Sequence, residues 1–524
     1  MSLIGIADLS FGYGGGEEIF SHLSLNLSDD WRLGLIGRNG RGKTTLLKIL
    51  AGELEYRGRI SAQARMVYFP FELDGQGGGM GQAGGMGLGS AREASPQDGN
   101  ELSSLEVLGR AFPGLGEWNL LREAALLALN EDCLKRPLAT LSPGEVTKLK
   151  LAALFAMEGV FPLLDEPSGG LDERGRRLAA GYLAKKKGFI VVSHDRFLLN
   201  RAIDHVLALG RNGPELFKGD FDSYWRTYEQ RGQSEAERAQ TLGKEVKRLK
   251  AAARRSMGWS HNAEKVKYGH GMFDKGAIGH KAAKMAKRAK SVAARRDKAL
   301  DEKSQIAWTT ERNPALGLKP LEHGPGRLID GRDLVLGYGN EAIIRGLDLT
   351  LEAGERLAVK GPNGCGKSLL VSVLTGGAGR VLSGRLTLAP RLVVSGLAQR
   401  NYLEKGTVRD FCQKNGSSET LVKTLLNYLG FGKGDLEKNL ENLSDGQKRK
   451  AHLALALAQS AHLYVWDEPL NFLDLFSRTQ LEDLILKDRP TMVFVEHDLT
   501  FMEKVATREL DLTPFSREFF DKSR

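Results

Sequence analysis

The sequence predicts an α/β protein in which two phosphate-binding-loop (P-loop) domains lie in tandem and are joined by an α-helical hairpin linker. Three observations predict this arrangement. The pattern G-x-x-x-x-G-K-[ST] occurs twice, at 37–44 and at 361–368. Each copy lies among alternating short apolar strands and helices, which is typical of α/β domains. A long stretch without proline, between Pro214 and Pro314, separates the two copies.

The composition is that of a globular protein with room for more than one core. At 524 residues the chain is long enough for two or three domains. Its three cysteines, Cys133, Cys365 and Cys412, form no C-x-x-C pair, which argues against a disulfide framework, a zinc finger or an iron–sulfur cluster. The first residues lack a signal-peptide pattern, and no window approaches the ~18 apolar residues of a membrane helix. We therefore expect a cytoplasmic protein without a membrane span.

We expect domain boundaries at 1–228, 229–320 and 321–524. The two phosphate loops are offset by 324 residues (Gly361 minus Gly37), whereas the later Asp-Glu-Pro motifs are offset by 302 (Asp467 minus Asp165). The first half therefore carries 22 additional residues between these motifs, and the glycine-rich segment 74–100 accounts for them. Low-complexity glycine sequence is typical of a flexible loop, so we interpret it as a tolerated insertion.

The segment between the halves has the pattern of two antiparallel helices. Apolar residues recur there at the spacings of three and four that make a coiled-coil seam. They are Ala239, Leu242, Val246, Leu249 and Ala253, and then Ala282, Met285, Ala289 and Val292. The pattern breaks near 257–279, which predicts the tip of the hairpin, and an arm of about 29 residues would extend roughly 43 Å.

This linker also holds the basic surplus of the chain. Between Arg231 and Lys303 there are 20 Lys and Arg against 8 Asp and Glu, a net charge of +12, whereas the whole chain has +10. The remainder is therefore about −2 by subtraction. A surplus confined to one segment indicates local contact with a polyanion.

Short apolar runs predict the strands that carry the motifs. In the first half these strands are 31–36, 65–69, 161–164 and 189–193. In the second half they are 356–359, 463–466 and 491–495. Because ligands of open α/β sheets bind beyond the strand ends, the motifs that follow these strands are expected to meet there.

Each phosphate loop predicts one nucleotide site, and we expect ATP with Mg²⁺. Glycines let backbone N–H groups approach the phosphates, Lys43 and Lys367 reach the β and γ phosphates, and Thr44 and Ser368 bind Mg²⁺. The expected ATP-binding residues of the two loops are Gly37, Asn39, Gly40, Gly42, Lys43, Thr44, Thr45, Gly361, Asn363, Gly364, Gly366, Lys367 and Ser368. Tyr13 and Tyr338 lie 24 and 23 residues before the loops and are candidates to stack on adenine, although each could simply be a strand-end aromatic.

An Asp-Glu-Pro motif ends an apolar strand in each half. Asp165 and Asp467 would hold Mg²⁺, and Glu166 and Glu468 are candidate general bases that polarise the attacking water. The next predicted strand is followed by a histidine in each half, and we expect His194 and His497 to contact the γ phosphate.

A Leu-Ser-x-Gly-[Glu/Gln] motif precedes a helix in each half. Its residues are Ser142, Gly144 and Glu145 in the first copy and Ser444, Gly446 and Gln447 in the second. A serine at a helix N-terminus makes an anion site. We expect each motif to close over the nucleotide that the other half holds, so that both halves build two composite sites.

These residues resemble the motifs of the ATP-binding-cassette (ABC) superfamily. Two cassettes with a charged helical linker and no membrane span resemble the ABC-F proteins, which act on ribosomes. The runs 31–43, 279–285 and 461–474 are similar to the Lsa-like branch of antibiotic-resistance ABC-F proteins. On this resemblance, 1–228 and 321–524 are the N-terminal and C-terminal ABC ATPase domains.

The resemblance implies ribosomal protection against antibiotics that bind the peptidyl-transferase centre. It implies the bacterial ribosome as partner, through large-subunit rRNA and P-site tRNA, and drugs of the lincosamide, pleuromutilin and streptogramin A type. We expect a monomer whose cassettes close on ATP and open after hydrolysis. Aromatic residues near the tip could stack on bases or on each other. The expected contacts with rRNA or tRNA are Trp259, Lys265, Lys267, Tyr268, Phe273, Lys281, Lys284, Lys287 and Arg288.

The first half departs from the family pattern at two places. Where the family has a glutamine that helps to hold Mg²⁺ and water, this half has Phe71, while the second half keeps Gln399. The family's Asn-His pair after the Asp-Glu-Pro motif is replaced by Gly169 and Gly170, while the second half keeps Asn471. Our hypothesis is that the two sites are unequal, with slower hydrolysis where Lys43 and Glu166 act.

Three other functions compete with this interpretation. An ABC-F translation factor without a resistance role would share every catalytic residue and differ in what the tip does. The ATPase subunit of an exporter would leave the basic hairpin without a purpose. A DNA-maintenance ATPase would usually need a longer coiled coil or zinc-binding cysteines.

Overall fold

The computed structural model describes residues 3–14, 18–73, 102–210, 213–268, 317–324, 326–362, 364–398 and 405–516, with scattered positions between 284 and 300. The chain divides into two compact units. One contains Met1–Phe221 and Ala315–Arg524, and therefore both halves of the repeat, and the other is Asp222–Pro314. The predicted insertion at 74–100 lies outside the described residues.

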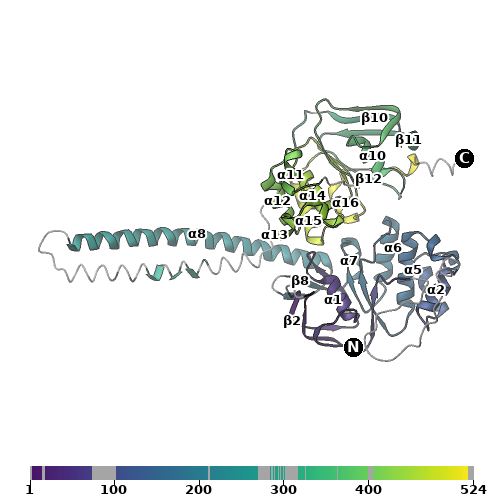
Figure 1. Cartoon of the computed structure of the whole chain (residues 1–524), viewed down its shortest axis with the longest axis horizontal. Helices are drawn as coiled ribbons and strands as arrows, with labels where there is room; N and C mark the ends of the chain where they lie inside the picture. Colours follow the sequence, from purple (N-terminus) through teal and green to yellow (C-terminus); the bar gives the residue numbers. More distant parts are fainter. Residues whose placement is uncertain are drawn as a thin grey trace. The chain divides into compact units, whose positions relative to one another are not determined.

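The N-terminal half contains two sheets and a group of helices (Figure 1). Its strands are β1 (Leu3–Phe11), β2 (Phe20–Ser28), β3 (Arg32–Gly37), β4 (Arg57–Ser61), β5 (Arg65–Phe69), β6 (Val160–Asp165), β7 (Phe189–Val192), β8 (His205–Gly210) and β9 (Gly213–Lys218). Its helices are α1 (Lys43–Leu50), α2 (Ser104–Ala111), α3 (Glu117–Leu126), α4 (Glu131–Lys135), α5 (Pro143–Ala156), α6 (Glu173–Leu183) and α7 (Arg196–Ala202), with a 3₁₀ turn at Leu138–Thr140. The sheet orders are β2-β1-β4 and β5-β6-β7-β3-β8-β9.

The C-terminal half repeats this plan. Its strands are β10 (Arg327–Tyr338), β11 (Glu341–Glu352), β12 (Arg356–Lys360), β13 (Arg380–Leu388), β14 (Val394–Leu397), β15 (Leu463–Asp467), β16 (Met492–Val495) and β17 (Arg508–Asp511). Its helices are α10 (Lys367–Leu374), α11 (Val408–Lys414), α12 (Glu419–Tyr428), α13 (Lys433–Leu436), α14 (Asp445–Ala458), α15 (Leu475–Asp488) and α16 (Leu499–Val505), with 3₁₀ turns at Leu440–Asn442 and Thr513–Phe515. The sheet orders are β11-β10-β13 and β14-β15-β16-β12-β17.

The two halves place equivalent strands at equivalent positions. The order β5-β6-β7-β3-β8 in the first half matches β14-β15-β16-β12-β17 in the second, and all of these neighbours pair in parallel. The predicted strands are confirmed to within one residue at each end. They read as continuous apolar runs because a parallel sheet is buried on both faces, and every residue of β7, β15 and β16 is buried.

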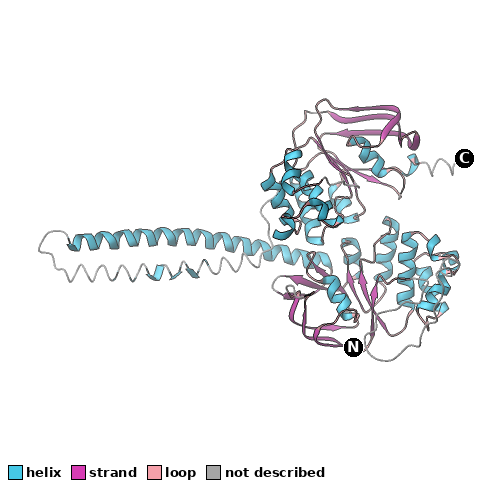
Figure 2. Cartoon of the chain, in the orientation of Figure 1, coloured by secondary structure: helices cyan, strands magenta, loops and turns pink. Residues whose placement is uncertain are grey.

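The second unit is helical. Helix α8 (Phe221–Tyr268) contains 48 residues and is drawn cyan in Figure 2, and its length corresponds to about 72 Å at 1.5 Å per residue. Ala239, Leu242, Val246 and Leu249 are half-buried, which confirms the seam over these positions. The described residues between 284 and 300 are also helical.

The bounds of this helix differ from those that the sequence predicts. Helix α8 begins at Phe221, inside the predicted N-terminal domain at 1–228, and it passes through Gly258 to Tyr268, into the predicted tip at 257–279. One glycine weakens a helix by only about 1 kcal/mol relative to alanine, so without a proline a long helix continues through it. The prediction that the helix breaks near 257 was therefore wrong.

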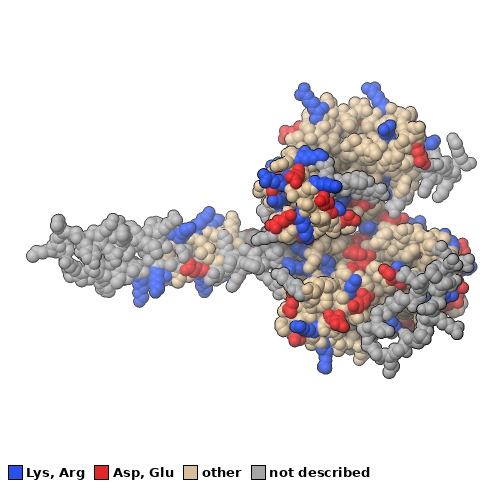
Figure 3. Space-filling model, viewed as in Figure 1, with Lys and Arg blue, Asp and Glu red and all other residues tan. Residues whose placement is uncertain are grey.

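The described surface of this unit is rich in basic side chains. Lys244, Lys247, Arg248 and Lys250 are exposed on α8, and Lys284, Lys287, Lys290, Arg295 and Lys298 are exposed on the later helical residues. Figure 3 shows blue side chains gathered on the described part of this unit. Within the described ranges, no helix combines the length and apolarity needed to cross a membrane.

Candidate nucleotide sites

Each phosphate loop connects the end of a central strand to a helix. The loop after β3 leads into α1, and the loop after β12 leads into α10. Gly42 and Gly366 precede the helices with φ of 82° and 104°. A Cβ on Gly42 would come within 2.5 Å of Ile19, and one on Gly366 within 2.8 Å of Ile344, so both positions require glycine. The other predicted loop glycines, Gly37, Gly40, Gly361 and Gly364, also have positive φ.

The two loop lysines lie inside their loops. Lys43 Nζ donates to the carbonyls of Gly37 at 2.8 Å and Arg38 at 3.1 Å. Lys367 Nζ donates to the carbonyls of Gly361 at 2.8 Å and Pro362 at 2.9 Å. Both side chains are buried, and desolvation lowers the pKa of Lys43. A buried ammonium group at a helix N-terminus is well placed to receive a phosphate anion.

The predicted magnesium ligands of the first half contact each other. Thr44 Oγ1 donates to Asp165 Oδ2 at 2.7 Å, and Tyr68 OH donates to the same oxygen at 3.0 Å. In the second half burial raises the pKa of Asp467, while the Ser368 hydroxyl opposes this shift by hydrogen bonding. No cluster of three His, Cys, Asp or Glu able to hold a metal occurs among the described residues. One hydroxyl and one carboxylate per half fit Mg²⁺ that is shared with nucleotide phosphates.

A glutamate and a histidine face each other beyond the strand ends in both halves. His194 Nε2 lies 3.6 Å from Glu166 Oε1, and His497 Nε2 lies 3.7 Å from Glu468 Oε1. The two glutamates share a left-handed backbone, with φ of 51° and 49°. Non-glycine residues rarely adopt this conformation, and such residues cluster at active sites.

The two glutamates differ in environment. Desolvation raises the pKa of Glu166 to about 7. The exposed fraction of the side chain also differs, at 41% for Glu166 and 21% for Glu468. Burial lowers the pKa of both His194 and His497, so their rings are neutral near pH 7. The matched backbones therefore present unequal carboxylates.

The Leu-Ser-x-Gly motifs begin helices α5 and α14 as capping boxes. Ser142 Oγ accepts from the Glu145 amide at 3.3 Å, while the Ser142 amide donates to Glu145 Oε2 at 2.8 Å. Ser444 and Gln447 exchange the same two bonds. This fixes both helix N-termini. Gly144 and Gly446 follow within the first turn of each helix. That each motif closes over the nucleotide of the other half stays a prediction.

The two tyrosines that could stack on adenine are exposed. Tyr13 OH lies 3.3 Å from Thr45 Oγ1 on α1, which places the ring beside the first phosphate loop. Tyr338 ends β10 and is also exposed. Both therefore remain available for a ligand.

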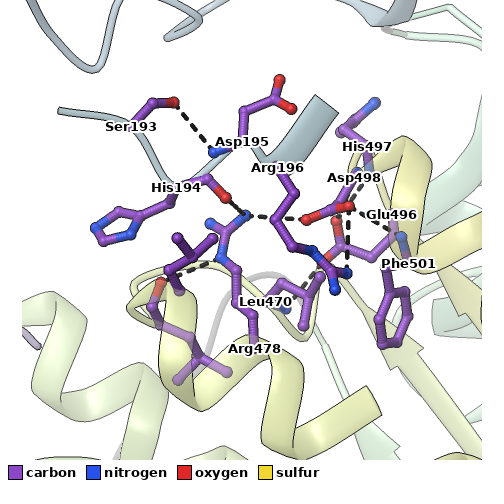
Figure 4. Close-up of polar contacts among 12 residues, drawn as sticks. Ser193, His194, Asp195, Arg196, Leu470, Arg478, Glu496, His497, Asp498 and Phe501 are labelled. Carbon is purple, nitrogen blue, oxygen red and sulfur yellow. Dashed lines mark hydrogen bonds and ion pairs between the residues drawn. The ribbon is translucent and has the colours of Figure 1, made fainter. Parts of the chain in front are cut away.

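The two halves touch around the first phosphate loop. The Asn39 amide donates to Asp474 Oδ2 at 3.3 Å, and Asn39 Nδ2 donates to the Phe472 carbonyl at 3.2 Å. Arg478 Nη1 donates to the His194 carbonyl at 3.1 Å (Figure 4). The turn 471–474 of the C-terminal half therefore contacts the nucleotide loop of the N-terminal half.

A buried ion pair extends this contact. Arg196 Nη2 lies 2.5 Å from Glu482 Oε2, and both side chains are 2% exposed. Asp498 lies 3.7 Å from Arg196 and 3.5 Å from Arg478 (Figure 4). Two arginines and two carboxylates therefore meet between the halves.

Several predicted site residues cannot be placed. Asn363, Gln399, Phe273, Lys281 and Arg288 lie outside the described residues. The backbones of Trp259, Lys265, Lys267 and Tyr268 belong to α8, but their side chains are not described. Of the predicted RNA contacts, Lys284 and Lys287 are described, and both are exposed.

Comparison with known proteins decides the family. The family model described as ABC transporter matches residues 20–169 and 344–471, which include both phosphate loops and both Asp-Glu-Pro motifs. The chain belongs to the ABC transporter family. It is an ABC-F ATP-binding protein with two ABC domains, and these domains hydrolyse ATP.

Curated relatives match along nearly the whole chain. "Probable ATP-binding protein YbiT" of Escherichia coli O157:H7 is 28% identical over 527 residues, covering 95% of this chain and 94% of the relative. "Ribosome protection protein VmlR" of Bacillus subtilis (strain 168) is 24% identical over 501 residues, covering 94% and 84%. The structure of the archaeal ribosome recycling factor aABCE1 with the stalk protein aP1 aligns with a TM-score of 0.58 at 21% identity, covering 96% of this chain and 87% of that chain. At that identity the likeness concerns the fold alone.

Sequence reasoning missed the contacts between the halves. No sequence pattern predicted the role of the turn at Asn471, or any role for Tyr68, Arg196, Arg478 or Glu482. The repeated pair Leu-Asp, at 171–172 and 473–474, was the available signal for the turn. Asp474 Oδ1 caps α15 by accepting from the Ser477 amide at 2.9 Å, so one carboxylate serves both the helix and the opposite half.

Proposed function

We propose that this ABC-F ATPase binds the bacterial ribosome and protects its peptidyl-transferase centre through the linker. The drugs concerned are lincosamides, pleuromutilins and streptogramin A compounds. The partners are large-subunit rRNA and P-site tRNA, and the protein acts in the cytoplasm as a monomer. Among ABC-F proteins the motif resemblance favours the Lsa-like resistance branch.

The observation that carries this proposal is the basic helical unit between two ATP-hydrolysing cassettes. Nine Lys and Arg side chains named above are exposed on its described residues, and the segment from Arg231 to Lys303 has a net charge of +12. Lys and Arg contacts to phosphates supply sequence-independent affinity for nucleic acid. The match to a protein named for ribosome protection supports the same partner.

ATP hydrolysis gives a role to each motif that the two halves share. Lys43 and Lys367 receive the β and γ phosphates. Thr44 with Asp165, and Ser368 with Asp467 and Gln399, would hold Mg²⁺, which would offset the charge of the phosphates. Glu166 and Glu468 accept the proton of the attacking water, and His194 and His497 contact the γ phosphate. The helices that Ser142 and Ser444 cap close each nucleotide from the opposite half.

The tip of the linker is the part that separates protection from ATP hydrolysis. Replacing residues 257–279 with a short Gly-Ser connection should abolish drug tolerance while ATP binding remains intact, because the cassettes keep every nucleotide contact. Minimum inhibitory concentrations and nucleotide binding measure the two properties. Undiminished tolerance in cells that carry this deletion would refute the role of the tip.

A second candidate is an ABC-F translation factor without a resistance role. YbiT is 28% identical to this chain and VmlR is 24% identical, so similarity alone does not favour the protection protein. The two functions share the ATPase and the ribosome. Drug tolerance distinguishes them, because only the protection protein raises it.

A further inference from the structure

The turn after each Asp-Glu-Pro motif has the same backbone in both halves. The amide of Gly169 donates to the Glu166 carbonyl at 3.0 Å, and the amide of Asn471 donates to the Glu468 carbonyl at 3.3 Å. Two residues later, the Leu171 amide donates to the Ser168 carbonyl at 3.3 Å. The Leu473 amide likewise donates to the Leu470 carbonyl at 3.2 Å. Since the framework matches, a difference between the halves must come from the side chains on it.

The side chains differ at the position that faces the glutamate. Asn471 Nδ2 donates a short hydrogen bond to Glu468 Oε2. Gly169 occupies the equivalent position, as 471 minus 302 gives 169. Glu166 Oε2 accepts only a long bond, 3.3 Å, from the His194 amide, and Glu166 Oε1 has no hydrogen-bond partner among the described residues. The Glu468 carboxylate is therefore held by an amide donor that the Glu166 carboxylate lacks.

The turn that carries Asn471 is itself held from the other half. Asn39 Nδ2 donates to the carbonyl of the next residue, Phe472, and the Asn39 amide donates to Asp474. These contacts hold the backbone of the turn from which the Asn471 side-chain amide projects. A donor on a fixed turn restricts the rotamers of the carboxylate that it meets, which is the requirement for a general base near its water.

We propose that Asn471 is the positioning residue of the Glu468 general base, and that Gly169 leaves Glu166 without one. The hydrolysis rate at the site that uses Glu468 is therefore higher. This inference rests on the proposed role of Glu468. The inference predicts that the difference between Asn471 and Gly169 makes the two sites unequal. Exchanging these two residues should therefore shift ATP hydrolysis from one site to the other.

The test exchanges the two residues in backgrounds that isolate one site each. In Glu166→Gln, where Glu468 alone can act as base, Asn471→Gly should lower kcat about 10-fold or more, as expected for losing a hydrogen bond to a charged group. KM for ATP should change less than about twofold, because binding depends on the phosphate loops. In Glu468→Gln, where Glu166 alone remains, Gly169→Asn should raise kcat several-fold. An added Cβ at Gly169 would meet the nearest atom, the Glu166 carbonyl oxygen, at 3.3 Å.

A matched variant separates the amide from the shape of the side chain. Asn471→Asp keeps the size of the residue but cannot donate, so it should lose kcat at least as strongly as Asn471→Gly. Full kcat in the aspartate variant would overturn the proposal, and so would a fall in ATP affinity that parallels kcat. If Glu468→Gln and Glu166→Gln lose equal turnover, the sites are equal and the inference fails. If Glu468→Gln loses nothing, the general-base role itself is wrong.

Discussion

Replacing both Glu166 and Glu468 with glutamine is expected to hold the protein on ribosomes in the presence of ATP. Glutamine keeps the shape of each side chain but cannot accept the proton of the attacking water. General-base catalysis contributes roughly 10²–10⁴-fold, so ATP turnover should fall by about that factor. The phosphate loops are unchanged, so ATP still binds and the cassettes stay closed.

Sedimentation through a sucrose cushion measures the outcome. The double variant should pellet with ribosomes when ATP is present and remain in the supernatant without it. Glu158→Gln with Glu503→Gln makes the same change in charge at two exposed residues and should sediment like the unaltered protein. Double-variant protein that binds ATP but stays free of ribosomes would count against the proposed cycle.

Replacing Glu482 with alanine is expected to destabilise the contact between the halves. Arg196 and Glu482 form an ion pair with both side chains 2% exposed, so the change leaves a buried guanidinium without its 2.5 Å partner. Breaking a buried pair by removing one member costs about 3–5 kcal/mol. For domains of this size the unfolding midpoint should fall by roughly 6–20 °C. Calorimetry measures the midpoint.

The other half of the repeat supplies the matched control. Leu499 is the equivalent of Arg196 in the C-terminal half, because each lies two residues after the histidine of its half. Ala180 is the equivalent of Glu482 in the N-terminal half, at the offset of 302 residues. The double variant Arg196→Leu and Glu482→Ala therefore installs the apolar pair of the other half and should recover part of the stability, because the guanidinium is removed together with its partner and buried Asp498 keeps Arg478 at 3.5 Å. Glu419→Ala removes the exposed pair with Lys423 and should cost at most ~1 kcal/mol. A Glu482→Ala midpoint as high as that of Glu419→Ala would contradict the importance of the buried pair.

The sequence predicted the parts of the site that lie close together in the chain. A strand, a glycine turn and a helix specify each phosphate loop locally, so the sequence predicted without tertiary information that Gly42, Lys43 and Thr44 lie where the loop enters α1. That these residues bind nucleotide stays a prediction. The strands were found because burial on both faces leaves continuous apolar runs. The shared order of the two motif sets, whose spacing differs by the 22 additional residues of the first half, then predicted a repeated fold.

The remainder depends on contacts that no local pattern encodes. Arg196 and Glu482 are 286 residues apart, and no pattern in the sequence around either residue indicates that they form an ion pair. The hydrogen bond from Tyr68 to Asp165 joins neighbouring strands across 97 residues. The extent of α8 was misjudged for another reason: its glycines weakened the pattern, but a long helix tolerates a local penalty of this size.

Growth of a drug-sensitive bacterium that expresses this protein tests the account most directly. Minimum inhibitory concentrations are compared for a lincosamide, a pleuromutilin, a streptogramin A compound and a drug that acts on the small ribosomal subunit. The account predicts higher values for the first three drugs only, and no increase when the tip at 257–279 is removed. Unchanged values for all four drugs in cells that contain folded protein would contradict ribosome protection and leave the translation-factor role.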